Sequence, residues 1–357
     1  MSKINDLIKK LCPNGVEYKK LKEISVMQRG QSITIKDLEE GDIPVIAGGQ
    51  TPSFYNNKYN RDGETITVSS SGAYAGFLNY WNVPILCTDS FTIKSKNVNM
   101  RFLYHYLKMN QNEIYNKKKG AGIPHVHISD IENFRMPVPP MEIQEEIIRI
   151  LDKFGELEVE LEAELEARKS QYEFWRGKLL NNKKYESVKI NDIAYNVSSG
   201  KCNSRNEDGF YPVYGSTGII AKTDEYLYET EKILIARVGA NAGYVHIANG
   251  KYNVTDNTLI LDLKDNVDLR FMYYYLQNYN LNKLAKGGGQ PLITGGQIKD
   301  LDICLPPIQE QKRISNILDK FDKLINDISE GIPSEIEFRR KQYEYYRNML
   351  LSFEEVS

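Results

Sequence analysis

The chain has 357 residues, of which 41% are hydrophobic and 26% are charged, and its formal net charge is −2. This composition excludes a disordered or fibrous protein, and the length predicts about two domains of roughly 100–200 residues each. The near-neutral charge argues against a simple basic nucleic-acid coat protein, although positive charge can still be concentrated in one segment.

The four cysteines are scattered along the chain without paired spacing, at Cys12, Cys87, Cys202 and Cys304. A disulfide framework or a zinc site needs paired cysteines, so this pattern predicts a reduced, cytoplasmic protein. The N-terminal segment has no signal-peptide core, and no apolar run approaches the roughly 18 residues of a membrane span.

Residues 15–138 predict a globular region of mixed α and β structure. Residues 65–68 are rich in β-branched side chains and lead to a glycine-containing turn, which is typical of a strand. Residues 101–110 have the aromatic-rich pattern of a helix. Pro137, Pro139 and Pro140 then mark a junction from strand to helix, because proline is tolerated where a helix starts.

Residues 143–180 predict one long helix, of about 57 Å if fully helical. Its apolar side chains recur at steps of three and four, as in a coiled coil. They are Ile143, Ile147, Ile150, Phe154, Leu157, Leu161, Leu165, Tyr172, Trp175 and Leu179. Between residues 156 and 167, Glu-Leu-Glu-Val and two copies of Glu-Leu-Glu-Ala each add a step of four, which is a stutter in the heptad pattern.

The second half of the chain repeats this order. Residues 183–305 predict another mixed region, with a strand at 232–235 and a helix at 270–278. A second helix follows Pro306 and Pro307, and Gly331-Ile332-Pro333 should kink or interrupt it. Its apolar stripe comprises Ile314, Ile317, Phe321, Leu324, Ile328, Ile336, Tyr343, Tyr346 and Leu350.

The two halves are copies of one unit. Nine of sixteen positions are identical between residues 139–154 and 306–321, and further matches link residues 72–76 to 239–243 and 120–124 to 287–291. We therefore expect an α+β fold, in which two duplicated globular domains are separated by a pair of long antiparallel coiled-coil helices with pseudo-two-fold symmetry. The alternative, that each stripe packs on its own domain, is disfavoured because ten apolar positions exceed what one small domain covers.

The charge follows the same division of the chain. Residues 1–138 carry a net charge of +5 and residues 139–182 a net charge of −5. Residues 183–305 are neutral, and residues 306–357 carry −2. The acidic excess thus lies on the predicted helices, and the positive excess lies on the first globular region.

Motifs for catalysis are missing from the sequence. It has no phosphate loop, no His-Glu-x-x-His metal motif, no nucleophile elbow and no Asn/Asp-Pro-Pro-Tyr/Phe motif of amino-methylating enzymes. His125 and His127 form the one histidine cluster, and the second copy has Leu292 and Thr294 there. Because a metal site needs three or four placed ligands, a structural or DNA-contacting role is favoured over metal binding.

This order of motifs resembles the specificity subunit of type I restriction-modification enzymes, and the resemblance covers nearly the whole chain. The matching residues are Pro139, Pro140, Gln144, Ile147, Leu151 and Lys153, and in the second copy Pro306, Pro307, Gln311, Ile314, Leu318 and Lys320. The resemblance implies that residues 1–138 and 183–305 are target-recognition domains, each reading one half of a split site in double-stranded DNA. It also implies that residues 139–182 and 306–357 are helical spacers that dock two methyltransferase subunits.

The resemblance further implies a chain without catalytic residues, metal or cofactor of its own. S-adenosylmethionine, ATP and magnesium are expected in the partner subunits, which would include restriction subunits. A complex that contains only methyltransferase subunits would use the same chain.

Candidate DNA-contacting residues lie in loops at equivalent places in both halves, where cations and polar side chains suit phosphate and base contacts. In the first half they are Arg29, Gln31, Ser70, Ser71, Tyr74, Lys117, Lys118, Lys119, His125 and His127. In the second half they are Lys201, Arg205, Arg237, Asn241, Lys286, Gln290 and Thr294. Tyr74 and Asn241 are the better candidates, because flanking glycines allow close backbone approach.

Four aromatic residues near the helix ends are candidates for the subunit interface: Phe174, Trp175, Tyr345 and Tyr346. Trp175 and Tyr346 also fall on the apolar stripes, which favours a place in the seam between the helices. Two other classes of function remain open: a coiled-coil scaffold whose domains bind protein, and an enzyme that uses His125 and His127.

Overall fold

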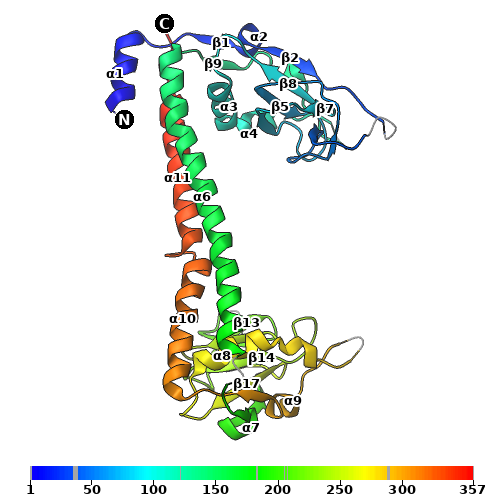
Figure 1. Cartoon of the computed structure of the whole chain (residues 1–357), viewed down its shortest axis with the longest axis vertical. Coiled ribbons are helices and arrows are strands. Elements are labelled where there is room, and N and C mark those ends of the chain that lie inside the picture. Colours follow the sequence, from blue (N-terminus) through cyan, green and yellow to red (C-terminus); the bar gives the residue numbers. More distant parts are fainter. Residues whose placement is uncertain are drawn as a thin grey trace. The chain divides into compact units, whose positions relative to one another are not determined.

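The computed structural model describes residues 2–34, 39–120, 122–181, 184–204, 206, 208–287 and 290–356. The chain divides into two compact units: residues 1–160 with 336–357, and residues 161–335. Each unit combines one mixed domain of strands and short helices with a section of long helix (Figure 1). The predicted α+β fold and its duplication are therefore confirmed.

The described residues of the first domain form three sheets, with strand orders β2-β8-β5-β6, β4-β3-β7 and β1-β9. The strands are β1 (Tyr18–Lys20), β2 (Val26–Arg29), β3 (Ile43–Ile46), β4 (Phe54–Asn56), β5 (Thr65–Ser69), β6 (Leu78–Trp81), β7 (Leu86–Cys87), β8 (Ser90–Lys94) and β9 (Arg135–Pro137). The short helices are α1 (Ser2–Leu11), α2 (Leu21–Ile24), α3 (Met100–Met109), α4 (Gln111–Tyr115) and α5 (Ile128–Ile131). The predicted strand at 65–68 and helix at 101–110 are confirmed as β5 and α3.

The second unit repeats this topology, with strand orders β11-β17-β14-β15, β13-β12-β16 and β10-β18. The strands are β10 (Ser187–Lys189), β11 (Ala194–Ser199), β12 (Tyr211–Gly215), β13 (Gly218–Thr223), β14 (Lys232–Ala236), β15 (Val245–Ala248), β16 (Asn253–Val254), β17 (Thr258–Leu263) and β18 (Asp302–Cys304). The short helices are α7 (Ile190–Ile193), α8 (Leu269–Tyr279), the 3-10 turn η2 (Leu281–Leu284) and α9 (Gly295–Lys299). Here α8 and β14 confirm the predicted helix and strand.

The central strand of each larger sheet is buried on both faces. All five residues of β5 are buried, and Ile66 and Val68 share a core cluster with Phe102 of α3. On its other face, Thr67 accepts a hydrogen bond of 2.9 Å from the indole nitrogen of Trp81. β-branched residues suit such a strand because they pack well on a pleated surface.

The long helices are α6 (Met141–Leu180), α10 (Ile308–Asn326) and α11 (Ile332–Leu351). The stutter at 156–167 leaves α6 continuous over 40 residues. The predicted interruption of the second helix is confirmed between α10 and α11, where a side chain on Gly331 would lie 2.6 Å from the carbonyl oxygen of Asp327. None of the helices in the described part of the chain combines the length and the apolar character that a membrane crossing needs.

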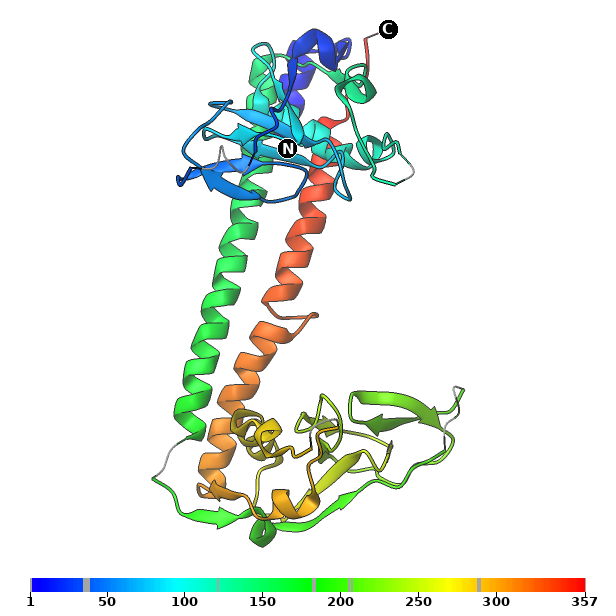
Figure 2. The ribbon, with the colours of Figure 1, turned by 90° about the vertical axis from the view of Figure 1, so that its right-hand side faces the viewer.

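Within each unit, α6 packs antiparallel against a partner helix (Figure 2). In the first unit, Phe154 stacks on Tyr346 of α11 with 5.4 Å between ring centroids, and Glu158 pairs with Arg340 at 2.6 Å. In the second unit, Tyr172 of α6 contacts Phe321 of α10, with ring centroids 6.2 Å apart. The predicted antiparallel helix pair is therefore confirmed inside each unit.

The stripes also pack on the domains, so the disfavoured alternative is correct in part. Ile143, Ile147 and Leu151 are fully buried in the core cluster of the first domain. Ile314 and Leu318 of α10 likewise join Phe271 and Tyr274 of α8 in one cluster. The first turns of α6 and α10 thus face the domain, because a helix that starts at a domain edge must cover that edge.

A buried glutamine fixes each domain to its helix. The side chain of Gln144 donates to the carbonyl of Pro139 at 2.7 Å and accepts from the backbone N–H of Asn99 at 2.9 Å. Gln311 does the same with Pro306 and Asp268, at 2.8 Å in both bonds. The repeated Pro-Pro and Gln therefore form a joint, in which the amide closes the loop before the helix and holds the start of α3 or α8.

Candidate nucleic-acid interface

Four loops meet at one end of the larger sheet in the first unit. Beyond β2, the backbone N–H of Gly30 donates to Ser90 at 2.7 Å. Beyond β5, the N–H of Gly72 donates to Pro124 at 3.0 Å, and Val126 donates to Ser70 at the same distance. In addition, Ser70 donates to Asp89 at 3.2 Å and Lys119 donates to His125 at 2.9 Å. Together these bonds bring the predicted candidates around residues 29–31, 69–74, 117–119 and 125–127 into one group of loops.

The second unit builds the same group of loops from its own residues. Gly239 donates to Pro291 at 3.0 Å, as Gly72 does to Pro124. Ile293 donates to Arg237 at 2.9 Å, as Val126 does to Ser70. The loops that the sequence repeat pairs with each other are therefore held by matching backbone hydrogen bonds in the two domains.

Glycine is needed at the turn after each central strand. Gly72 has φ +81° and Gly239 has φ +78°, in the left-handed region that L-residues avoid. A side chain at either position would meet no atom within 4 Å, so the conformation and not the space requires glycine. Two residues after each glycine, the side chains of Tyr74 and Asn241 are exposed at the tip.

Most candidate side chains in the loops are exposed and polar. Those of Arg29, Gln31, Tyr74, Lys117, Lys119, His127, Lys201, Asn241, Lys286, Gln290 and Thr294 are exposed, whereas Ser70, Ser71, Lys118, His125 and Arg237 are half-buried. Arg205 lies outside the described residues. Exposed side chains around a fixed backbone suit contacts to phosphate groups and base edges.

Several candidates are already engaged inside the protein. Lys119 forms an ion pair with Asp130, and Lys118 donates to the carbonyl of Ala73 at 3.0 Å. Although burial raises the pKa of Asp130, hydrogen bonds from Lys119 and from the backbone of His127 lower it below its usual value. These lysines therefore hold the loop together as well as carrying charge.

The two histidines are stacked, with ring centroids 5.9 Å apart and an angle of 9° between the planes. Thr294, which stands where the first copy has His127, caps α9 by accepting a hydrogen bond from the N–H of Gln297 at 3.3 Å. Across the residues that the structure describes, no group of three or more His, Cys, Asp or Glu is placed to hold a metal ion.

Arg237 has a donor that is not used. Its Nε is buried and has no hydrogen-bond partner, while its Nη1 lies 3.4 Å from the carbonyl of Asp256. Turning this side chain toward a ligand would cost no Nε hydrogen bond, which suits a residue that reads DNA.

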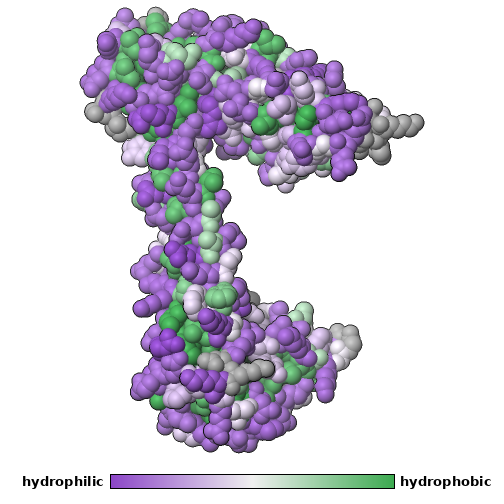
Figure 3. Space-filling view, in the orientation of Figure 1, coloured by the Kyte–Doolittle hydropathy of each residue, from purple (hydrophilic) through white to green (hydrophobic). Residues whose placement is uncertain are grey.

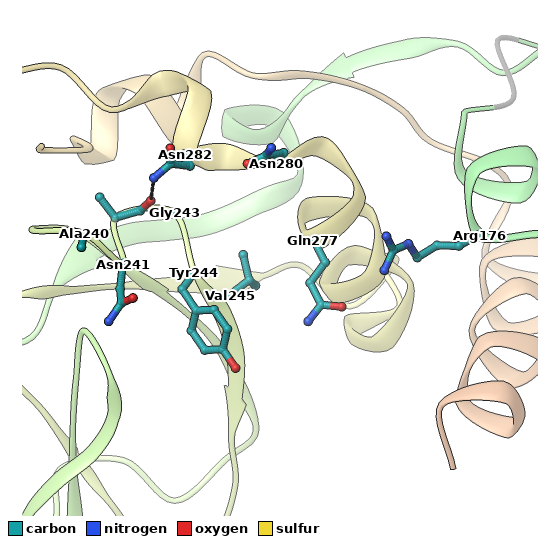
Figure 4. Close-up of a pocket in the computed structure, with 10 residues that line it drawn as sticks. Arg176, Ala240, Asn241, Gly243, Tyr244, Val245, Gln277, Asn280 and Asn282 are labelled. Atoms are coloured by element: carbon teal, nitrogen blue, oxygen red, sulfur yellow. Dashed lines mark hydrogen bonds between the residues drawn. The ribbon is translucent and has the colours of Figure 1, made fainter. Parts of the chain in front are cut away.

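A cavity of about 410 Å³ opens beside the tip of the second domain. Figure 4 shows the side chains of Asn241, Tyr244 and Gln277 extending toward the same side, with Arg176 of α6 on the far side of Gln277. Asn282 donates to the carbonyl of Ala242 at 2.9 Å and fixes the tip from behind. The cavity joins the tip to the helix, so Arg176 is a further candidate contact.

The loop at residues 48–50 also lies beside this group of loops, although no sequence pattern predicted it. The carbonyl of Ser71 would lie 2.9 Å from a side chain on Gly48, and Ser69 donates to the carbonyl of Gly49 at 3.4 Å. Gln50 is exposed on this loop. The Gly-Gly-Gln tripeptide was the available signal, but the equivalent turn at the end of β12 in the second domain reads Gly215-Ser216-Thr217 instead.

Three of the four predicted interface residues, Phe174, Trp175 and Tyr345, are exposed on the helices. Phe174 and Tyr345 are 62% and 64% exposed at equivalent positions. Tyr346 stacks on Phe154 in the seam, as predicted. The seam placement of Trp175 is not supported: this side chain is 36% exposed and packs edge-on against Phe174 of the same helix. Figure 3 shows hydrophobic patches among hydrophilic ones on the helical segments.

Known proteins are similar to this chain in sequence and in fold. The family model for the type I restriction modification DNA specificity domain matches residues 13–168 and again residues 182–338. The Escherichia coli EcoR124I/EcoR124II specificity subunit is 28% identical, over 99% of this chain and 98% of its own. A Mycoplasma pneumoniae protein named as a candidate type I specificity subunit is 30% identical, over 83% of this chain and 95% of its own.

Solved structures agree with the fold. The type I restriction-modification S subunit from M. genitalium superposes with a TM-score of 0.65 at 18% identity, covering 94% of this chain and 96% of that one. The HsdS subunit from Thermoanaerobacter tengcongensis gives 0.54 at 16% identity, covering 96% and 97%. At such identities the likeness concerns the fold alone.

Proposed function

The chain belongs to the family of type I restriction-modification DNA specificity subunits, and on this premise we propose that each of its domains reads one half of a bipartite DNA target. The observation that carries this proposal is the repeated group of loops. Both domains hold their loops with the same backbone hydrogen bonds, yet Ser70 is replaced by Arg237 and Tyr74 by Asn241. One scaffold with different side chains at its tips suits two readers of different half-sites.

The helical segments complete the proposal. Along the chain, residues 139–182 connect the recognition domains, residues 1–138 and 183–305, and residues 306–357 follow the second domain. Together the two helical segments would set the length of the non-specific spacer. The exposed Phe174, Trp175 and Tyr345 provide apolar contact area for two methyltransferase subunits. Catalysis, with S-adenosylmethionine, ATP and magnesium, is assigned to the partner subunits, including restriction subunits, and this chain is proposed to be non-catalytic.

The test is selection from a library of split duplex sites, with the full chain bound to its methyltransferase subunits. We expect a bipartite motif. Tyr74→Ala should relax only one half-site and Asn241→Ala only the other, because the two tips belong to different domains. Selection without any base preference would contradict the proposal and favour a protein-binding scaffold. The chain alone should bind DNA weakly, so equal specificity without partners would also count against it.

A deletion tests the spacer. Removing residues 160–163, one Glu-Leu-Glu-Ala tetrapeptide, shortens α6 by about 6 Å, a little under two base-pair steps of roughly 3.4 Å. We expect a shorter spacer between unchanged half-sites, read by sequencing methylated sites in cells. The matched control, Glu160→Gln with Glu162→Gln, changes charge without length and should leave the spacer as it is. An active deletion variant with the original spacer would contradict the idea.

A further inference from the structure

The first domain has a basic cavity at the end of the sheet opposite to the candidate interface. Arg29 and Phe91 pair at the interface end of β2 and β8, and Val26 and Lys94 pair at the other end. The cavity there has a volume of about 500 Å³. Four of its twelve lining residues are cationic and one is acidic; the cations are Lys22, Arg61, Lys94 and Lys96.

Arg61 places a buried positive charge beneath this cavity. Its side chain is almost fully enclosed, at 8% exposed. Its three nitrogens donate to Thr92 Oγ1 at 2.9 Å and to the carbonyls of Asn60 and Arg29 at 2.7 and 2.8 Å. All three acceptors are neutral, and none of the described carboxylates forms an ion pair with Arg61. Buried charges are normally paired, so this one lacks its counter-charge.

The acidic residue of the cavity does not supply the missing charge. Glu23 accepts a hydrogen bond from the backbone N–H of Lys20 at 2.9 Å and forms no ion pair with Arg61. Lys94 donates to the carbonyl of Asp62, which is again a neutral acceptor. Lys22 and Lys96 are exposed at the rim.

The second domain shows that the fold does not require these cations. Tyr228 forms the backbone bridge that Arg61 forms in the first domain. Asp262 follows the core residue Leu261 where Lys94 follows Ile93, and it pairs with Lys232. Only the equivalent of Lys96 keeps its charge, as Lys264, which donates to the carbonyl of Asp192 at 2.8 Å. The cluster therefore belongs to the first domain alone.

We propose that this cavity binds the phosphate groups of a phosphorylated ligand. Its volume lies within the roughly 300–1,000 Å³ of ligand sites. Lys22, Lys94 and Lys96 would contact phosphate oxygens as point charges. Arg61, each of whose three nitrogens already donates a hydrogen bond within the domain, would act through its charge. The phosphate can belong to a DNA backbone or to a free nucleotide, and the site requires no particular target sequence.

Calorimetric titration of the full chain with inorganic pyrophosphate tests the proposal. We expect saturable binding, weakened at least tenfold by Lys22→Glu with Lys96→Glu. Both side chains are exposed, so circular dichroism should show an unchanged fold. The control, Lys264→Glu, reverses one charge at the equivalent of Lys96 and should leave the affinity unchanged. Absence of binding to the natural chain, full binding by the double variant, or equal weakening by the control would overturn the proposal.

Competition identifies the source of the phosphate. Displacement of pyrophosphate by a duplex without the selected target indicates backbone phosphate. Displacement by AMP but not by the duplex indicates a small phosphorylated ligand, and displacement by neither overturns the assignment. Half-site selection by the same double variant, with its methyltransferase subunits, should keep its base preferences, so failure of this proposal can be told apart from failure of the proposed function.

Discussion

The two halves of the molecule differ sharply at one carboxylate of the joint between domain and helix. In the first half, Asp152 of α6 accepts from His105 Nε2 at 2.9 Å and pairs with Arg101. In the second half, the equivalent Asp319 of α10 accepts from the hydroxyl of Tyr274 at 2.6 Å. The same acceptor on the helix thus meets different donors on the domain.

This difference shows which part of the joint the fold depends on. The carboxylate and Gln144 or Gln311 are kept in both copies, whereas the donor is free to change as long as it reaches the carboxylate. His105 gains a proton when the pH falls below neutral, whereas Tyr274 loses one only when the pH rises above neutral. Burial lowers the pKa of His105, although Asp152 raises it, and burial together with Asp319 raises the pKa of Tyr274.

Truncating the equivalent leucines should have the largest effect. Leu151 and Leu318 are both fully buried. Each Leu→Ala change should cost about 2–5 kcal/mol, because the lost contacts leave a cavity. Hydrogen exchange should report the loss in the affected unit only, since a chain with two units need not unfold in one step. Equal loss of protection in both units would show that they unfold together.

Replacing the glutamines should come next. Gln144→Ala and Gln311→Ala each leave a buried proline carbonyl and a partly buried N–H without the glutamine partner, which costs about 1–3 kcal/mol. The amides of Asn99 and Asp268 should lose protection from exchange in their respective variants. Gln→Glu serves as the control, because it keeps the acceptor for the N–H and removes the donor to the proline carbonyl. If only one of the two alanine variants is destabilised, the joints are not equivalent.

The pH dependence should separate the halves. A histidine whose pKa is lowered by folding contributes stability above its unfolded value of about 6.5, and that stability is lost as the pH falls toward the folded value. The first unit should therefore weaken below about pH 6.5. Tyr274 has a raised pKa, so its contribution is lost only as the pH rises through about 10.

Exchange rates of α3 and α8 between pH 5 and 8, corrected for intrinsic rates, measure this difference. His105→Tyr should make the first unit resemble the second by removing the loss of protection near pH 6. If His105→Tyr still loses protection near pH 6, the loss is caused by another titratable group.

The smallest effect is expected at the surface. Arg340 and Glu158 pair at 2.6 Å, but their side chains are 54% and 29% exposed. Arg340→Ala should cost less than about 1 kcal/mol, since exposed ion pairs are weak. Its counterpart in the second unit, Lys169, pairs with Glu166 on its own helix, so Lys169→Ala is the control. A larger cost for Arg340→Ala would show that this pair helps to hold α6 against α11.

Local sequence patterns predicted the helices and strands of this fold, but they did not predict contacts between residues far apart in the sequence. The stripe of α6, the prolines before it and the break at Gly331 could all be read from neighbouring residues. Leu151 was missed as a stripe position because it lies one residue from Ile150, but it is fully buried in the domain core beside Ile143 and Ile147. Trp175 was assigned to the seam because its spacing fits the stripe, but it is 36% exposed and packs on Phe174 of its own helix.

The loops of the candidate interface were predictable from the internal duplication and not from local patterns. Duplication pairs one loop with another, so the sequence alone points to positions such as Tyr74 and Asn241. It gives no information where one copy stands alone, as at Gln50 and Arg61. The contact of His105 with Tyr343, at 3.0 Å, joins residues 238 positions apart, which no local pattern reports.

The first unit combines the two ends of the sequence, and this affects the order in which the units can fold during synthesis. The first unit needs residues 336–357, and the N–H of Val16 donates to Glu354 at 2.8 Å near the C-terminus. The second unit is one continuous stretch, residues 161–335. On the ribosome, where domains usually fold in the order of their synthesis, the second unit can therefore be completed first. Until the last residues emerge, Phe154 lacks Tyr346, so a nascent chain stalled before residue 336 would present an uncovered apolar stripe to chaperones.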